Sequence, residues 1–123
     1  MQLNLERPEY RYLLRGANGA MALVNELQLQ RSFIVAPDAL IENWPARAGV
    51  PLTPQDLQPL LELTPEVVVL GTGAVQVFPA AAVLAECLVR GVGIEVMGNA
   101  AAARTFNVLA GEGRRVVAGF LFP

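Results

Sequence analysis

The sequence predicts an α/β fold, and its central element is the stretch Val67-Val68-Val69-Leu70-Gly71-Thr72-Gly73. Four consecutive apolar residues, three of them β-branched, are closed at once by a Gly-Thr-Gly break. Such a run is typical of a strand that is covered on both faces. From Val67 onward, apolar patterns and breaks alternate in the order strand, helix, strand, helix, strand. This order predicts a sheet with at least two parallel strands, because a helical crossover joins the first two.

The N-terminal half predicts short strands separated by turns. Residues 16–19 read Gly-Ala-Asn-Gly, which favours a hairpin turn because glycine and asparagine accept positive φ. Pro37-Asp38 begins a second turn. The expected strands are residues 10–15, 21–24, 31–35 and 40–44. They either extend the main sheet or lie across it, and residues 1–9 are expected to form a loosely ordered arm.

Three helices follow from capping residues and apolar spacing. The first, residues 53–63, begins at Thr53-Pro54-Gln55-Asp56, and Pro59 within it either falls in an early turn or bends the helix. The second, 79–90, ends before Gly91. The third, 100–110, is expected to take Asn99 as its cap. The remaining expected strands are 67–70, 93–97 and 114–121, with a short extended piece at 76–79.

Length and composition predict a single domain, residues 1–123, and limit the partners and the catalytic groups that the chain can use. It is 54% hydrophobic and 16% charged, with a net charge of −2, which argues against nucleic acid as a partner. There is no histidine, the commonest acid–base group and metal ligand. No apolar run approaches the ~18 residues of a membrane span. One cysteine and no signal-peptide pattern favour a cytoplasmic protein, and we expect no metal and no cofactor.

The sharpest candidate site lies at the carboxyl ends of the two predicted parallel strands. Gly71, Thr72 and Gly73 follow one strand, and Gly98 and Asn99 follow the next. Ligands of open α/β sheets bind at this edge. The dinucleotide pattern G-x-G-x-x-G fails, because Gln76 stands in place of the third glycine. The glycines therefore either contact a ligand or simply turn the chain after a buried strand.

Among the charged residues, Glu95 is the strongest candidate for a functional role, because it lies within a strand that we expect to be largely covered. A carboxylate in that position requires a partner. Arg104 is the natural candidate, and Asn107 lies one helical turn further along the same face. Two interpretations are open: a structural Glu95–Arg104 pair that joins helix to sheet, or part of a ligand site. Cys87, on an apolar helical stripe without any histidine, is expected to be a buried thiol rather than a nucleophile.

The C-terminal half resembles a family of small single-domain α/β proteins. The motifs that carry the resemblance are 67–73, 91–97, Arg104-Thr105-Phe106-Asn107 and Glu112-Gly113-Arg114. That family includes mitochondrial respiratory complex I assembly factor 3 and an adipogenesis-associated human protein, with many uncharacterised bacterial members. The resemblance implies a three-layer fold around a mixed sheet, a final strand antiparallel to its neighbours, and an N-terminal β-layer packed nearby.

The resemblance also implies function, since the family has no established catalytic activity and its mitochondrial member acts by protein association. We therefore expect a non-enzymatic interaction protein, by resemblance an assembly factor for respiratory-chain complexes, with a protein partner. The first alternative is a small-molecule-binding domain or enzyme with a site at Gly71, Thr72, Gly73, Glu95, Gly98, Asn99, Arg104 and Asn107. The second alternative is a domain that only self-associates, as a homodimer.

Overall fold

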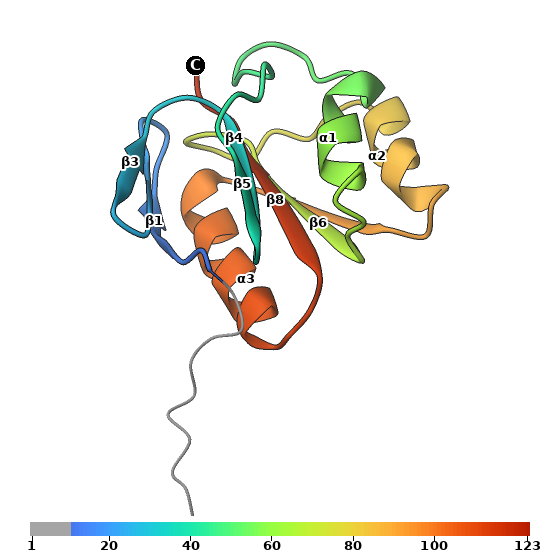
Figure 1. Ribbon diagram of the computed structural model, residues 1–123. Helices are drawn as coiled ribbons and strands as arrows, with labels where there is room; N and C mark the ends of the chain where they lie inside the picture. The colour runs from blue at the N-terminus through green and yellow to red at the C-terminus, as the bar shows by residue number, and fades with distance from the viewer. Residues whose placement is uncertain (1–10) are drawn as a thin grey trace, which may run out of the picture.

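A computed structural model describes residues 11–123 of the chain, so the expected arm at residues 1–9 lies outside the described residues. The predicted α/β class is confirmed: in the described chain, helices pack on both faces of a mixed five-stranded sheet, and a small three-stranded sheet lies beside them (Figure 1). Strands β6 (Val67–Gly71) and β7 (Gly93–Met97) match the apolar runs that predicted them, and they pair in parallel.

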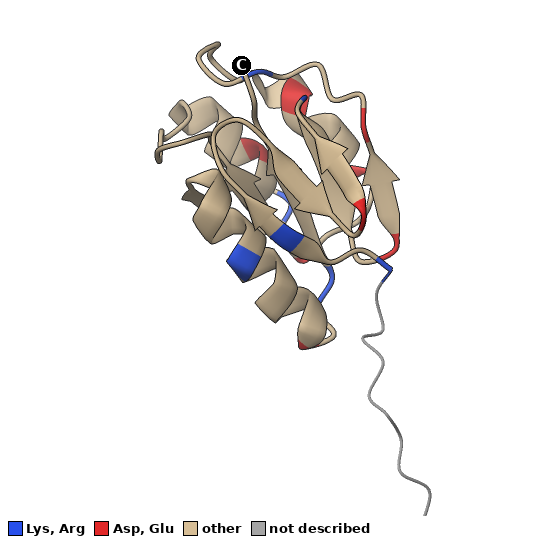
Figure 2. Ribbon diagram, turned by 90° about the vertical axis from the view of Figure 1, so that its left-hand side faces the viewer, with Lys and Arg blue, Asp and Glu red and all other residues tan. Residues whose placement is uncertain are grey.

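The main sheet has five strands in the order β5-β4-β8-β6-β7. Its other members are β4 (Phe33–Ala36), β5 (Ala39–Ile41) and β8 (Val116–Phe120). Strands β4, β6 and β8 are buried along their whole length, as expected for central strands that are covered on both faces. Figure 2 shows that charged residues are sparse along these strands.

The final strand corrects the expectation that it runs antiparallel to its neighbours. Strand β8 lies between β4 and β6; it is antiparallel to β4 but parallel to β6. The register pairs Val67 with Val116 and Gly71 with Phe120. The physical reason is the connection through helix α3 (Asn99–Gly111), which returns the chain to the edge at which β6 begins. The carboxyl ends of β6, β7 and β8 therefore share one edge of the sheet.

Two cores lie on opposite faces of this sheet. One contains α3 together with Phe33, Val69 and Phe120. The other lies beneath a helical pair formed by α1 (Gln58–Leu61) and α2 (Ala81–Leu88). Figure 1 shows α3 on one side of the sheet and α1 with α2 on the other.

A second, three-stranded antiparallel sheet forms the expected N-terminal β-layer. It consists of β1 (Leu14–Ala17), β2 (Ala22–Val24) and β3 (Leu27–Leu29), and it packs beside α3. Strand β3 was not expected from the sequence. It follows Asn25, whose positive φ of 52° supplies a tight turn directly after β2.

Three local predictions differ from the structure. The expected helix 53–63 is a 3-10 turn, η1 (Pro54–Leu57), followed by the single turn α1, so that Pro59 falls in a first turn. The expected extended piece at 76–79 is a loop without a strand. Asn99 does not cap α3: Gly98 takes that position, and the Asn99 side chain makes other contacts described below.

Candidate functional site

A pocket of about 330 Å³ opens at the edge of the sheet where β6 and β8 end. Thr72, directly after β6, and Leu121, directly after β8, line its inner part and are almost fully buried, 6% and 4% exposed. Two loops form its walls, the one after β5 and the one between β6 and α2. The lining residues are Arg47, Ala48, Gly49, Val50, Pro51, Leu52, Thr72, Val77, Phe78, Pro79, Ala80 and Leu121.

The Thr72 hydroxyl shapes one wall by fixing the turn that follows β6. It donates to the Val75 carbonyl oxygen at 2.6 Å and accepts from the Val77 N–H at 2.9 Å. Gly73 has φ of 105°, a conformation that favours glycine. The turn leaves the side chains of Val75, Val77 and Phe78 exposed to solvent. The Gly-Thr-Gly break therefore presents apolar side chains at the mouth of the pocket.

The other wall is held to the end of β8 by the backbone. The Ala48 N–H donates to the Phe122 carbonyl oxygen at 3.0 Å. Within the loop after β5, the Trp44 indole is buried and donates to the Asp56 carbonyl oxygen at 2.9 Å, which ties the loop to η1. These contacts fix this wall relative to the segment that follows β8 and to η1.

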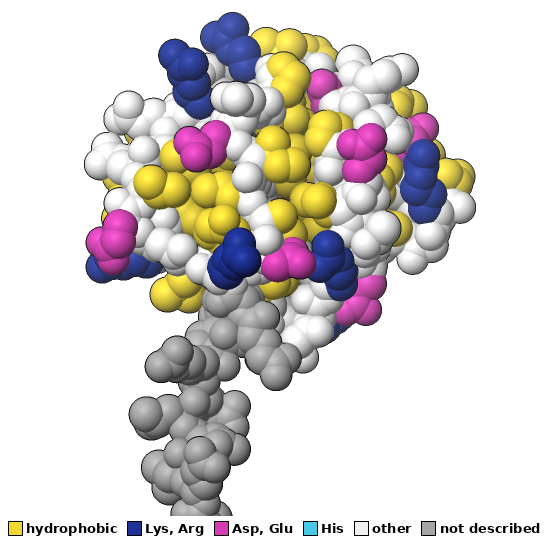
Figure 3. Space-filling view, viewed as in Figure 1, with side chains coloured by type: hydrophobic (Ala, Val, Ile, Leu, Met, Phe, Trp, Pro, Cys, Tyr) yellow, Lys and Arg dark blue, Asp and Glu magenta, His cyan; other side chains and the backbone are white. Residues whose placement is uncertain are grey.

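Arg47 is the one charged residue among those that line the pocket, and it is exposed. None of the ion pairs among residues 11–123 includes it. Figure 3 shows that cationic, acidic and hydrophobic side chains all reach the surface on the face it draws. The site is therefore an apolar pocket with a cationic rim.

Asn99 lies beside the pocket but is fully occupied by structural contacts. Its side chain is completely buried. The Oδ1 atom accepts from the Gly73 N–H at 3.1 Å, and Nδ2 donates to the carbonyl oxygens of Asn18 and Leu121, both at 3.0 Å. One amide thus joins the β1–β2 turn, the Gly-Thr-Gly loop and the end of β8.

The glycines predicted for the site are close to Asn99 rather than to open space. A Cβ atom on Gly71 would lie 2.5 Å from Asn99 Oδ1, and one on Gly98 would lie 3.5 Å from two backbone carbonyl oxygens. Glycine is required at Gly71 because the Asn99 amide packs directly against its backbone. The structure brings Gly71, Thr72, Gly73, Gly98 and Asn99 together as predicted; that they bind a ligand stays a prediction.

The expectation for Glu95 is wrong in one respect, because its side chain is exposed. β7 is the edge strand of the sheet, so a residue in it need not be covered. Its neighbours Ile94 and Val96 do point to the opposite face, into the core under α2. Arg104 is also exposed, and no ion pair between it and Glu95 occurs within residues 11–123. The predicted structural pair is therefore not formed there.

Asn107 and Cys87 both have packing roles. The Asn107 side chain accepts from the Leu14 N–H at 3.0 Å and donates to the Leu14 carbonyl oxygen at 2.6 Å. It completes the edge of β1 and fastens the small sheet to α3. Cys87 is buried on the inner side of α2, and burial raises the pKa of its thiol, which agrees with the predicted inert thiol.

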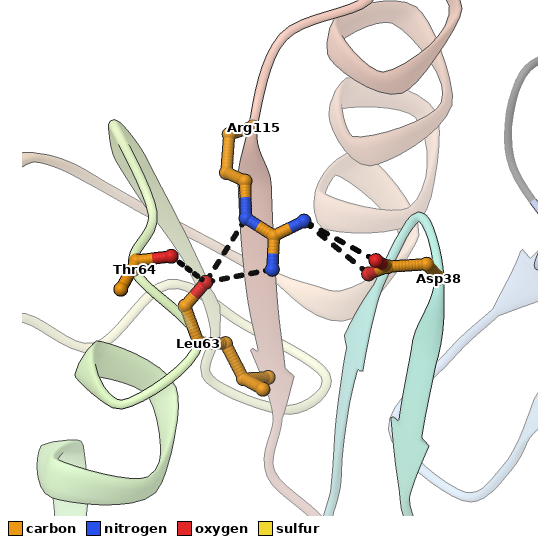
Figure 4. A network of polar contacts seen from close by, with 4 residues as sticks. All are labelled: Asp38, Leu63, Thr64 and Arg115. Atoms are coloured by element: carbon orange, nitrogen blue, oxygen red, sulfur yellow. Dashed lines mark hydrogen bonds and ion pairs between the residues drawn. The ribbon is translucent and has the colours of Figure 1, made fainter.

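A smaller hollow of about 180 Å³ lies at the opposite end of β8. The two arginines that line it already form ion pairs within the protein. The Arg115 guanidinium donates to the Leu63 carbonyl oxygen and pairs with Asp38 at 3.3 Å (Figure 4). Arg114 pairs with Glu66 at 3.3 Å. These contacts join three chain segments, so this cluster is structural.

Sequence reasoning missed Arg47, Val77 and Phe78, the residues that give the pocket its character. The usable signal was the apolar segment directly after Gly73, which ends in Val77-Phe78-Pro79 although it lies in a loop. Large apolar side chains in a loop at the carboxyl edge of a sheet indicate a contact surface.

Two further features concern residues 11–123. No group of three or more potential ligands is arranged to hold a metal ion. None of the helices there combines the length and apolarity that crossing a bilayer requires.

Comparison with known proteins assigns most of the chain to one family. The family described as "Protein of unknown function (DUF498/DUF598)" matches residues 16–121. A Xanthomonas campestris protein solved by NMR is 54% identical, with a TM-score of 0.83, over 98% of this chain and 92% of that one. A Bordetella parapertussis crystal structure is 33% identical, with a TM-score of 0.83, over 89% and 94%. A Bordetella pertussis Mth938-like domain is 26% identical, with a TM-score of 0.79, over 98% and 92%. Among curated proteins, none matches this chain.

Proposed function

We propose that this chain, which belongs to the DUF498/DUF598 family of proteins of unknown function, is a non-enzymatic interaction protein that binds its partner through helix α2. The carrying observation is the outer face of that helix. Ala81, Ala82, Ala85, Leu88 and Val89 are all exposed there. We call these five residues the α2 surface.

The α2 surface is apolar in a position where helices of soluble proteins usually carry charges. Leu88 and Val89 are 63% and 77% exposed, and Ala81, Ala85 and Leu88 repeat at helical spacing. At the start of the helix the surface continues into the exposed Val77 and Phe78. Contiguous apolar surface of this kind marks interaction sites more often than isolated exposed residues do.

The charged groups of α2 leave this surface open. Glu86 and Arg90 pair with one another at 2.7 Å, and Glu86 also accepts from the Gln58 side chain at 3.2 Å. Both contacts direct the charges toward α1 and along the helix. A partner that covers the α2 surface therefore does not have to desolvate an unpaired charge of this helix.

The resemblance gives the partner its proposed identity. We infer that the protein acts in the cytoplasm as an assembly factor for respiratory-chain complexes, holding a subunit before its incorporation. The exposed apolar helix supports association with a protein, and the net charge of −2 favours neither nucleic acid nor an anionic membrane.

A second candidate is a small-molecule-binding domain, and one observation favours it. The pocket between β6 and β8 lies where ligands bind in open α/β sheets, and its volume is at the lower end of the ~300–1,000 Å³ typical of ligand sites.

Site-specific photo-crosslinking in living bacteria tests the proposed interaction. A benzophenone amino acid at Ala85, on the α2 surface, is expected to crosslink to a respiratory-complex subunit. The matched control places the same group at Val108, an exposed apolar position on α3. Leu88→Glu is expected to abolish the crosslink and Val108→Glu to preserve it, while both variants keep wild-type stability within ~0.5 kcal/mol, as for most surface substitutions.

The crosslinked species decides between the hypotheses. Crosslinks of equal yield from positions 85 and 108 would refute a dedicated surface. A product of twice the protomer mass from position 85 alone would favour the self-associating domain instead. Crosslinking to a specific partner outside the respiratory complexes would support the interaction function but refute the role as an assembly factor.

A further inference from the structure

The pocket between β6 and β8 has a feature that protein association through the α2 surface does not explain. Its walls are apolar, its inner residues Thr72 and Leu121 are nearly inaccessible to solvent, and the single charged residue lining it is Arg47. An apolar cavity with one cation at its rim is suited to a ligand that has an apolar body and an anionic head.

The Thr72 hydroxyl, the polar side-chain group in the inner part of the pocket, is already hydrogen-bonded, which limits the chemistry of the ligand body. The Thr72 hydroxyl both donates to Val75 and accepts from Val77, so it has little capacity left for a polar ligand group. Val50, Val77 and Phe78 supply the rest of the contact area near the mouth. A saturated or aromatic hydrocarbon group is therefore the complementary body.

The charge at the rim selects the head group. Arg47 takes part in no ion pair among residues 11–123, and no acidic residue lines the pocket. Pro79 and Ala80 lead into the N-terminus of α2, whose dipole adds to the positive potential at the same wall. One guanidinium matches one carboxylate in a bidentate contact, whereas a phosphate dianion calls for more donors than this lining offers.

We propose that this pocket binds a medium-chain alkyl carboxylate, with the hydrocarbon chain against Val50, Val77 and Leu121 and the carboxylate on Arg47. Binding is reversible and involves no covalent step. The pocket adjoins the α2 surface at Val77 and Phe78, but the crosslinking positions Ala85 and Val108 do not line it, so ligand binding and crosslinking are measured at different residues.

Titration of the ¹⁵N-labelled full chain with hexanoate, octanoate and decanoate, followed by NMR, tests the proposal. Amide shifts are expected in residues 47–52, 72, 77–80 and 121. Affinity is expected to rise about fourfold for each added methylene until the pocket is filled, following the transfer free energy of a CH₂ group. Octan-1-ol is expected to bind about tenfold more weakly than octanoate, and octylammonium more weakly still, because Arg47 repels it.

Three variants separate the head-group contact from the cavity. Arg47→Gln is expected to bind octanoate and octan-1-ol equally, whereas Arg104→Gln, an exposed arginine on α3, keeps the wild-type preference. Ala80→Leu, which fills the pocket from an exposed position, is expected to weaken all three probes at least tenfold. Far-ultraviolet circular dichroism confirms that each variant is folded before titration.

Four results would each overturn the proposal. They are the absence of shifts at millimolar octanoate, shifts centred on the α2 surface, equal affinity of the wild type for octanoate and octylammonium, and loss of head-group preference in Arg104→Gln. The crosslink from Ala85 is measured in a separate experiment. Failure of carboxylate binding therefore does not refute partner binding through the α2 surface, and the reverse also holds.

Discussion

Replacing Asn99 by Ala is expected to destabilise the protein strongly, because one buried amide joins three chain segments. Its Oδ1 atom satisfies the Gly73 N–H, and its Nδ2 atom satisfies the carbonyl oxygens of Asn18 and Leu121. Truncation leaves the Gly73 and Leu121 groups buried without a partner, while water replaces the contact at the less buried Asn18. With ~1–3 kcal/mol for each of these two unsatisfied buried groups, we expect a loss of ~2–6 kcal/mol.

Urea denaturation followed by circular dichroism measures this loss. Asn99→Asp is the sharper test, because it keeps the size of the side chain but places an oxygen opposite two carbonyl oxygens. It is therefore expected to be at least as destabilising as Asn99→Ala. Asn43→Ala, at an exposed asparagine, is the matched control and should change stability by less than ~0.5 kcal/mol. Wild-type stability of Asn99→Asp would refute the assignment of a structural role to this amide.

Three further predictions concern close packing and burial. Gly71→Ala should lower stability by ~1–3 kcal/mol in urea denaturation, because its Cβ would lie 2.5 Å from Asn99 Oδ1; an unchanged midpoint would contradict that contact. Gly119→Ala should cost a similar ~1–3 kcal/mol and shift tryptophan fluorescence to the red, since its Cβ would lie 2.7 Å from the Trp44 ring. The Cys87 thiol should resist a disulfide reagent until the protein unfolds. Because burial raises its pKa above the ordinary 9.0, stability should be complete below pH 9 and fall as pH rises further, a slope that Cys87→Ala removes.

The central strands of the main sheet were predictable because they are buried on both faces. A continuous apolar run identified β6 almost to the residue, and the apolar residues on either side of Glu95 identified β7; neither required knowledge of the neighbours. The helix after β7 was equally clear from its apolar spacing and the glycine at its end. These features are local, and local patterns determine the type of each element.

The order of the strands was not predictable, and this explains the errors about Glu95 and β8. Whether a strand lies at the centre or at the edge depends on which distant segments pair with it. Val67–Leu70 and Gly93–Met97 have similar lengths, yet β6 is central and β7 is the edge. An exposed glutamate is natural at an edge, where a charge also discourages pairing with another chain.

The candidate site was located by its edge of the sheet but not by its residues. The glycines and Asn99 were expected near the carboxyl ends of the strands, and they are there. Arg47 was not expected, because it reaches the pocket from a loop whose path is set by the buried Trp44 and by a backbone contact to the end of β8. Tertiary contacts of this kind leave no periodic trace in a sequence.

The central position of β8 has a consequence for how the chain acquires its structure during synthesis. β4 and β6 are not neighbours in the sheet; each pairs with β8, which leaves the ribosome after the other four strands of this sheet. Until it emerges, the hairpin of β4 and β5 and the pair of β6 and β7 remain separate fragments with open, hydrogen-bonding edges. Completion of the sheet is therefore a late event that joins residues about ninety positions apart, such as Phe33 and Phe120. Between completion of β7 and emergence of β8, both edges are free to pair with other chains, which is the interval in which this protein is most exposed to misassembly.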